Sequence, residues 1–204
     1  MQTLVLDEAD RLLDLGFAQE LERIRSLLPA QHQSLLYSAT FPAAVRAMAQ
    51  ASLRDPVEVT VQSEPEAQPD IRQRAIQVDA PQRNAVLRHL IASEGWARVL
   101  VFVATKYAAE MVADKLRRAG LQAEPFHAQL SQGKRSQVLA DFKSSAIRVM
   151  VATDVAARGI DIQDLPVVVN YDLPRSASDY THRIGRTARA GASGLAVSLS
   201  LIHI

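Results

Sequence analysis

From Ile71 onward, short apolar runs alternate with stretches of helical periodicity, and this alternation limits the fold more than any other feature of the sequence. The runs are rich in β-branched residues and almost continuously apolar, which is typical of strands covered on both faces. Strands separated by helices favour a parallel sheet with right-handed crossovers, and sites in such sheets lie at the carboxyl ends of the strands. The sequence therefore predicts an α/β fold. The expected strands are Arg74–Val78, Arg98–Val103, Ala123–Phe126, Arg148–Thr153, Val167–Tyr171 and Leu195–Leu199, and the expected helices are Pro81–Ser93, Tyr107–Ala119, Ser131–Lys143 and Ala177–Arg189.

Residues 1–61 show the same alternation in a shorter form. Residues 62–70 contain two Pro, three acids and no large apolar group, which indicates a linker. Because about sixty residues with three strands and no phosphate loop are too few for an independent nucleotide-binding domain, we predict a partial first lobe (1–61) and a nearly complete second lobe (71–204). The expected elements of the first lobe are a strand from Thr3, helices Arg11–Phe17 and Ala18–Leu28, strand Gln33–Ser38, helix Ala43–Ser52 and strand Val57–Val61.

Composition excludes several classes of protein. The chain has no Cys, so disulfides and thiolate metal sites are excluded, and this absence fits a reducing compartment. The start has no features of a signal peptide, and no apolar run approaches the roughly 20 residues of a membrane span. We therefore expect a cytoplasmic protein without membrane contact. His32 and His127 have no ligand partners at metal spacing, and we interpret both as structural.

Charge is distributed unevenly along the chain. Residues 1–70 hold five Arg and no Lys against eleven acids, a balance of −6, whereas residues 71–204 hold 18 cations against eleven acids, a balance of +7. The second part is therefore the better candidate for contact with nucleic acid. Since aromatic residues make up only 5% of the chain, we expect contact with the nucleic-acid backbone more than base stacking.

Three acids follow the first apolar run, which ends at Leu6. Asp7, Glu8 and Asp10 stand where a buried strand is expected to end. P-loop-type NTPases hold the magnesium ion of their nucleotide with a carboxylate in this position, and a neighbouring carboxylate can orient water. The alternative is that one Asp caps the helix that starts near Glu8, which explains one acid but not a pair.

A basic stretch, Tyr180–Gly191, lies near the other end of the chain. On one helix, His182, Arg186 and Arg189 would share a face, with Arg183 about 100° away. Cations stacked in this way repel each other unless an anion docks against them, and a polyphosphate is the natural candidate, bound as by an arginine finger. The alternative is a solvated basic face.

Six motifs together make the sequence resemble the DEAD-box family of ATP-dependent RNA helicases, with the bacterial RhlE-like members as the expected branch. The motifs stand in the order of the family and cover nearly the whole chain, which makes coincidence a poor explanation. They are DEAD at Asp7–Asp10, SAT at Ser38–Thr40, VLVFVATK at Val99–Lys106, QxxR at Gln132–Arg135, ATDVAARGIDI at Ala152–Ile162 and HRIGRTARAG at His182–Gly191.

The resemblance implies RecA-like parallel sheets with helices on both faces, and ATP with Mg²⁺ bound between two lobes. Asp7 is expected to hold Mg²⁺ through water, and Glu8 to orient the attacking water. Arg186 and Arg189 are expected to reach the γ-phosphate, and the resemblance places Gly159 and Asp161 near the nucleotide. The alternative for Asp161 is turn formation.

The resemblance also assigns residues to coupling and to RNA. Asp10, Ser38, Thr40 and His182 are expected to link the nucleotide state to strand separation. Single-stranded RNA or a short RNA duplex is the expected partner, and the residues expected to contact it are Thr105, Gln132, Arg135 and Thr153. Helix capping remains open for Ser38, Thr40 and Thr105, and ordinary exposed surface for Gln132 and Arg135.

Two features depart from the pattern of the family. Ala188 stands where Gly is usual, a small change that puts no role in doubt. The sequence has no GxxxxGK[ST] loop, so we expect that these 204 residues alone do not hydrolyse ATP. The alternative function is a non-catalytic RNA-binding lobe that acts as an interaction module.

Overall fold

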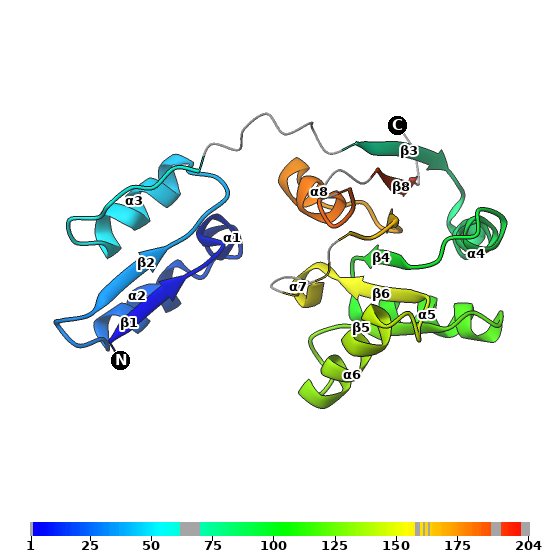
Figure 1. Ribbon diagram of the computed structural model, residues 1–204, viewed down its shortest axis with the longest axis horizontal. Coiled ribbons are helices and arrows are strands. Elements are labelled where there is room, and N and C mark those ends of the chain that lie inside the picture. The colour runs from blue at the N-terminus through cyan, green and yellow to red at the C-terminus, as the bar shows by residue number, and fades with distance from the viewer. Residues whose placement is uncertain are drawn as a thin grey trace. The chain divides into compact units, whose positions relative to one another are not determined.

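The structure, a computed structural model, describes residues 2–61, 70–157, 160, 162, 164–188 and 193–200. The chain divides into two compact units, Met1–Gln62 and Ser63–Ile204 (Figure 1). All strands that pair in either unit run parallel, as the alternating pattern predicts. No helix in the described residues is long and apolar enough to cross a membrane.

The first unit is built on two parallel strands, β1 (Thr3–Leu6) and β2 (Gln33–Leu36), paired from Thr3↔Gln33 to Leu6↔Leu36. The connection between them runs through α1 (Ala9–Asp14) and α2 (Ala18–Ser26), and α3 (Ala43–Ser52) follows β2. Leu4, Leu6 and Leu21 form the small core. The expected helix Ala43–Ser52 is confirmed at both ends.

The expected strand Val57–Val61 is wrong. These residues form no strand, and the side chains of Val57, Val59 and Val61 are 88%, 78% and 84% exposed. The alternation of Val57, Val59 and Val61 with polar residues is typical of a strand. A strand also needs a neighbouring backbone to pair with, and the described residues of this unit supply none here. The expected linker, residues 62–70, lies outside the described residues except for Asp70.

In the second unit, the described residues form a six-stranded parallel sheet in the order β3-β8-β7-β4-β6-β5. Each expected strand is present, with ends within three residues of the prediction. The strands are β3 (Ile71–Gln77), β4 (Val99–Val103), β5 (Ala123–Phe126), β6 (Val149–Thr153), β7 (Val167–Asn170) and β8 (Gly194–Ser200).

Helices cover this sheet on both faces, as the apolar strands predict. Alternate residues of β4 show the two faces: Val99, Val101 and Val103 pack in the cluster that contains helix residues Leu87 and Val112, whereas Leu100 and Phe102 pack in the cluster with Val138 and Phe142. The helical elements are η1, a short 3₁₀ helix (Ala80–Gln82), α4 (Arg83–Ser93), α5 (Lys106–Arg118), α6 (Gln132–Lys143), α7 (Asp154–Ala157) and α8 (Ala177–Ile184).

Helix α8 ends at Ile184, five residues before the predicted end at Arg189. Gly185 is its C-terminal cap residue, and beyond it the chain turns back so that Thr187 forms a bridge with Leu165. The Thr187 hydroxyl donates to the Leu165 carbonyl, and the N–H of Leu165 donates to the Arg186 carbonyl. The N–H groups of Arg186 and Thr187 bond to carbonyls three residues earlier in the chain, those of Arg183 and Ile184, so the α-helix does not continue to Arg186 as predicted.

Strand β8 begins at Gly194, where no side chain fits. A Cβ atom there would press on Thr187 Oγ1 and lie 2.8 Å from the Ala188 nitrogen. We predict that Gly194→Ala lowers the free energy of unfolding of the second unit by about 1–3 kcal/mol. Urea unfolding, followed by the fluorescence of Trp96, measures the change, because Trp96 is the single Trp of the chain and lies in this unit.

Gly133→Ala is the matched control for this prediction. Gly133 lies in α6 with no atom within 4 Å of its built Cβ, and we expect a gain of about 0.5–1 kcal/mol there because Ala is the better helix former. Equal stability of the two variants would contradict the close contact at Gly194.

Candidate active site

The first two acids stand directly after β1, with Asp7 exposed. The Asp7 Oδ1 atom accepts a hydrogen bond of 2.8 Å from the Glu8 N–H, and Glu8 adopts a left-handed backbone conformation with φ of 51°. That conformation costs energy for a residue with a Cβ, and such residues concentrate at functional sites. The N-cap residue of α1 is Glu8, whose side chain makes no capping hydrogen bond among the described residues, and the hydrogen bond of Asp7 is to the Glu8 N–H, so the helix-cap alternative does not account for Asp7.

Asp10, in contrast, is buried and bonded to both hydroxyls of the Ser-Ala-Thr motif. Thr40 Oγ1 donates to Asp10 Oδ2 at 2.6 Å, and the Asp10 N–H donates to Ser38 Oγ at 3.2 Å. The capping alternative for these hydroxyls is wrong, because Pro42 is the N-cap residue of α3 and no described side chain caps that helix. Burial by itself raises the pKa of Asp10, but the hydrogen bonds from Thr40, Ser38 and the Arg11 backbone outweigh it and hold the pKa below its usual 3.8.

The residues expected to contact RNA lie along one edge of the second sheet. Strands β4, β6 and β5 are neighbours and parallel, so their carboxyl ends meet at that edge. Thr105 follows β4, Thr153 ends β6, and Gln132 and Arg135 stand in the first turn of the helix after β5. The structure therefore brings these four residues to the same edge.

The hydrogen bonds of Thr105, Gln132 and Arg135 test the alternative interpretations, helix capping for Thr105 and ordinary exposed surface for the other two. Thr105 is the N-cap residue of α5, and its Oγ1 accepts from the Ala108 N–H at 3.1 Å, so it caps a helix as the alternative held. Gln132 is exposed and accepts from Arg135 Nη1 at 3.4 Å, and the Arg135 guanidinium lies 5.5 Å from the centre of the Phe126 ring. The Gln-Arg pair faces one way, as its spacing predicts.

The basic stretch is only partly within the described residues. His182 lies in α8, and Arg186 follows this helix with its Nη1 donating to the Ile160 carbonyl at 3.0 Å. Both side chains are half-buried. Gly159, Asp161 and Arg189, which the sequence also placed near the nucleotide, lie outside the described residues.

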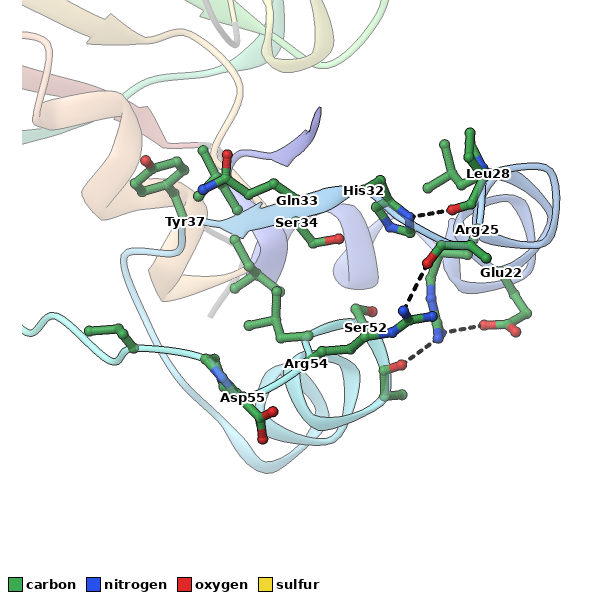
Figure 2. Close-up of a pocket in the computed structure, with 18 of the residues that line it drawn as sticks. Glu22, Arg25, Leu28, His32, Gln33, Ser34, Tyr37, Ser52, Arg54 and Asp55 are labelled. Atoms are coloured by element: carbon green, nitrogen blue, oxygen red, sulfur yellow. Dashed lines mark hydrogen bonds and ion pairs between the residues drawn. The ribbon is translucent and has the colours of Figure 1, made fainter. Parts of the chain in front are cut away.

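A cavity of about 680 Å³ in the first unit lies along β2 and does not include the acids after β1 (Figure 2). Two arginines on its wall are already bonded within the unit. Arg25 Nη1 contacts Glu22 Oε2 at 2.7 Å, and Arg54 Nη1 donates to the Ala30 carbonyl at 2.8 Å (Figure 2). His32, on the same wall, contacts the Pro29 carbonyl, in keeping with a structural role. Because these polar groups are paired internally, the cavity is a weaker candidate than the strand ends.

Family models and known proteins that match the chain show which family these motifs represent. The family model for DEAD/DEAH box helicases matches residues 1–48, and the model for the helicase conserved C-terminal domain matches residues 82–191, more than half of the chain. The ATP-dependent rRNA helicase RRP3 of Gibberella zeae is 41% identical over 200 residues, which are 98% of this chain and 41% of that protein. The DEAD-box ATP-dependent RNA helicase CshA of Geobacillus kaustophilus is 41% identical over 198 residues, 97% of this chain and 42% of that protein.

The chain belongs to the DEAD-box helicase family. It spans less than half the length of these two relatives. Among solved structures, Saccharomyces cerevisiae Dbp5 bound to RNA and ADP BeF3 matches with a TM-score of 0.82 and 34% identity, over 98% of this chain and 53% of that one. A DEAD box protein from Methanococcus jannaschii matches with a TM-score of 0.61 and 37% identity, over 98% and 53%. The parallel sheets covered by helices therefore have the RecA-like fold of DEAD-box helicases.

The sequence analysis gave no role to Arg183 of this DEAD-box chain, yet the Arg183 side chain has several hydrogen bonds within the protein. Its side chain is 3% exposed, and its Nε and Nη2 donate to the two carboxylate oxygens of Asp154 at 2.6 and 2.7 Å. Its Nη1 donates to Asn170 Oδ1 at 3.0 Å and to the Asp172 carbonyl at 2.6 Å. Arg183 therefore fastens α8 to the ends of β6 and β7. The sequence held one signal for this inward direction: Arg183 lies next to the apolar Ile184 and about 100° away from the helix face of His182.

We predict that Arg183→Met lowers the free energy of unfolding of the second unit by about 2–4 kcal/mol, because it leaves Asp154 and Asn170 without their buried partner. Urea unfolding followed by Trp96 fluorescence measures this. Arg175→Met, at an exposed position before α8, is the control and is expected to change stability by less than about 0.5 kcal/mol. Equal effects of the two substitutions would contradict the role of the buried guanidinium.

We predict that Thr40→Val raises the pKa of Asp10 in this DEAD-box chain, because it removes a hydrogen bond that favours the carboxylate. A folded-state pKa below the unfolded value stabilises the fold at pH values above the unfolded pKa, and this stability is lost as pH falls through the folded pKa. The variant therefore loses less stability than the wild type on acidification below about pH 4. NMR titration of the Asp10 carboxyl carbon measures the pKa, with Ser26→Ala in α2 as control, and an unchanged value in Thr40→Val would reject the assignment.

Proposed function

We propose that this chain is part of an ATP-dependent RNA helicase that couples ATP hydrolysis to local opening of short RNA duplexes. The observation that carries the proposal is the bonding of Asp10 to Ser38 and Thr40, because it joins the acidic motif to the motif expected to respond to the nucleotide. Relatives that match nearly all of the chain bear the names of ATP-dependent RNA helicases, which supports the same function.

The acids after β1 fit a nucleotide-bound Mg²⁺ held mostly by water and phosphate. Asp7 is exposed and offers carboxylate oxygen, the ligand type that Mg²⁺ prefers. Within the described residues, no group of three or more His, Cys, Asp or Glu could hold a metal, so the ion is expected to keep several waters. In the proposal, Asp7 would hold Mg²⁺ through water and Glu8 would orient the attacking water. A bound ion would supply positive charge near the phosphates of ATP.

In the proposal, guanidinium groups of the second unit would complete the nucleotide site of the whole protein. Arg186 and Arg189 would stabilise the charge that develops on the γ-phosphate, as arginine fingers do. Gly159 and Asp161 would lie near the nucleotide, with Asp161 beside the ribose. The coupling residues in this proposal are Asp10, Ser38, Thr40 and His182.

RNA would bind at the carboxyl edge formed by β4, β6 and β5. Hydroxyls of Thr105 and Thr153 and the Gln132–Arg135 pair offer donors and acceptors for phosphate and ribose, which carry no base sequence. The balance of +7 over residues 71–204 favours a polyanion. The matching structure of Dbp5 is of that protein bound to RNA, which supports RNA as the partner here, single-stranded or in a short duplex.

Membership of the DEAD-box family also supports a domain assignment. We infer that residues 1–61 are the C-terminal part of the first RecA-like domain, 62–70 the linker, and 71–204 the second RecA-like domain. A cytoplasmic location and membership of the RhlE-like branch stay predictions from the sequence. The 204 residues alone are expected to bind RNA without hydrolysing ATP.

ATP hydrolysis tests the catalytic roles in a longer protein, in which a segment with a phosphate-binding loop precedes this chain. We predict hydrolysis that RNA stimulates, and a loss of about 10³-fold or more in Arg186→Ala, because an arginine finger is worth about 10³–10⁵ in rate. Glu8→Gln is expected to abolish turnover because it removes the carboxylate that orients water. Release of phosphate measures the rate.

Two exposed residues serve as controls, Arg88→Ala on α4 and Glu20→Gln on α2, and both are expected to keep the wild-type rate. Full activity in Glu8→Gln or Arg186→Ala would reject the assigned roles. Salt-sensitive RNA binding without any hydrolysis in the longer protein would favour the alternative, a non-catalytic RNA-binding lobe.

A further inference from the structure

Asp172 connects three elements at the edge where the RNA contacts are proposed. It follows β7 closely, and its Oδ1 accepts from Arg83 Nη2 at 2.6 Å while its Oδ2 accepts from the Ala104 N–H at 2.8 Å. Its backbone carbonyl accepts from Arg183 Nη1 at 2.6 Å. Neither Asp172 nor Arg83 belongs to the six sequence motifs, so neither has a role in the function proposed above.

The hydrogen bond between the Ala104 N–H and Asp172 stands where a backbone hydrogen bond between β4 and β7 would stand if their pairing continued. The pairing of β4 with β7 ends at Phe102↔Asn170, so the backbone of Ala104 lies beyond the last partner on that side. The Asp172 carboxylate supplies the missing acceptor. Ala104 is followed by Thr105, the residue that caps α5, and the position of this cap therefore depends on the turn that Asp172 holds.

Arg83 fixes the carboxylate from the other side. Arg83 is buried at the start of α4, and its guanidinium carbon lies 4.0 Å from the centre of the Tyr171 ring. The side chains of Arg83 and Asp172 are 11% and 23% exposed, so water screens their ion pair only in part. A charge-assisted bond to a guanidinium held against a ring leaves the carboxylate little freedom to move.

We propose that the Asp172–Arg83 pair is a positioning device for RNA binding: it holds the Ala104–Thr105 turn so that Thr105 faces the nucleic acid. Asp172 and Arg83 act through this turn and do not touch RNA themselves. The proposal rests on the RNA binding proposed above and adds two positioning residues to it. Through the bond of its carbonyl to Arg183, Asp172 also joins this turn to α8, the helix that precedes Arg186.

The affinity of the 204-residue chain for RNA tests the proposal. Fluorescence anisotropy of a labelled ten-nucleotide oligouridylate gives the dissociation constant, at low salt and at a temperature where Trp96 fluorescence shows each variant to be folded. We predict that Asp172→Asn weakens binding about tenfold, because the amide offers one oxygen where two donors need acceptors. Arg83→Gln is expected to weaken it to a similar degree.

The double variant distinguishes one device from two independent effects. If the pair acts as a unit, Asp172→Asn with Arg83→Gln binds no more weakly than either single variant, whereas independent effects multiply. Arg83→Lys, which keeps the charge but loses the planar group stacked on Tyr171, should bind RNA more tightly than Arg83→Gln and more weakly than the wild type. Arg74→Gln breaks a half-buried ion pair of 2.8 Å with Glu94 elsewhere in the same unit and is the control that should bind normally.

Hydrogen exchange at Ala104 supplies a readout that general destabilisation would not give. In Asp172→Asn the Ala104 amide should exchange faster, with no change at Val101 inside β4. Wild-type affinity in both single variants, or an equal loss in Arg74→Gln, would overturn the positioning role while leaving the RNA function intact. If the unaltered chain does not bind the oligouridylate, the proposed RNA function itself fails, and this role fails with it.

Discussion

The hydrogen bonds of the buried Arg183 guanidinium hold together the carboxyl edge of the second unit's sheet, where the proposed RNA contacts lie. Removing an arginine from water costs several kcal/mol, and only full pairing offsets this cost. Arg183 meets the requirement with acceptors from Asp154, Asn170 and Asp172, which stand at the ends of β6 and β7. Because the acceptors of Arg183 are fixed at these strand ends, the buried side chain also fixes where α8 packs on the sheet.

A related arrangement occurs at two other strand ends, one in each unit. Asp10, shortly after β1, accepts from the Thr40 hydroxyl beyond β2, and Asp172, shortly after β7, accepts from the Ala104 N–H beyond β4. In each case a carboxylate continues the pairing of two neighbouring strands past the end of their backbone ladder. Both donor residues, Thr40 and Ala104, are exposed, so water could also satisfy their donors. The two carboxylates instead fix the backbone just beyond the strands, because a hydrogen bond to a charged group is stronger than one between neutral groups.

The sequence predicted most of the elements, and the resemblance to DEAD-box helicases predicted that Ser38 and Thr40 act together with Asp10, but the contacts of Arg183 were missed. The strand Ala123–Phe126 and the helix Ala43–Ser52 agree with the prediction at both ends. Pro42 marks the start of the helix, and the strand follows from its place between two helices, because its residues include Glu124 and Pro125. The strand Val57–Val61 was wrong, and so was the continuation of the last helix over Gly185–Ala188, since both depend on partners that are distant in sequence. Arg183 was missed for the same reason: periodicity shows which way a residue points, but it does not name the carboxylate that allows the charge to be buried.

The exposure of the side chains separates two kinds of polar residue at these edges. Asp7, Thr105 and Gln132 are exposed, whereas Asp10 and Arg183 are buried and have several hydrogen bonds within the protein. An exposed group with few internal bonds can exchange water for a ligand at little cost, whereas a buried and bonded group would have to break its contacts first. The buried set is therefore suited to hold the exposed set in place. It follows that a substitution in the buried set changes function through geometry, and that one in the exposed set changes it through direct contact.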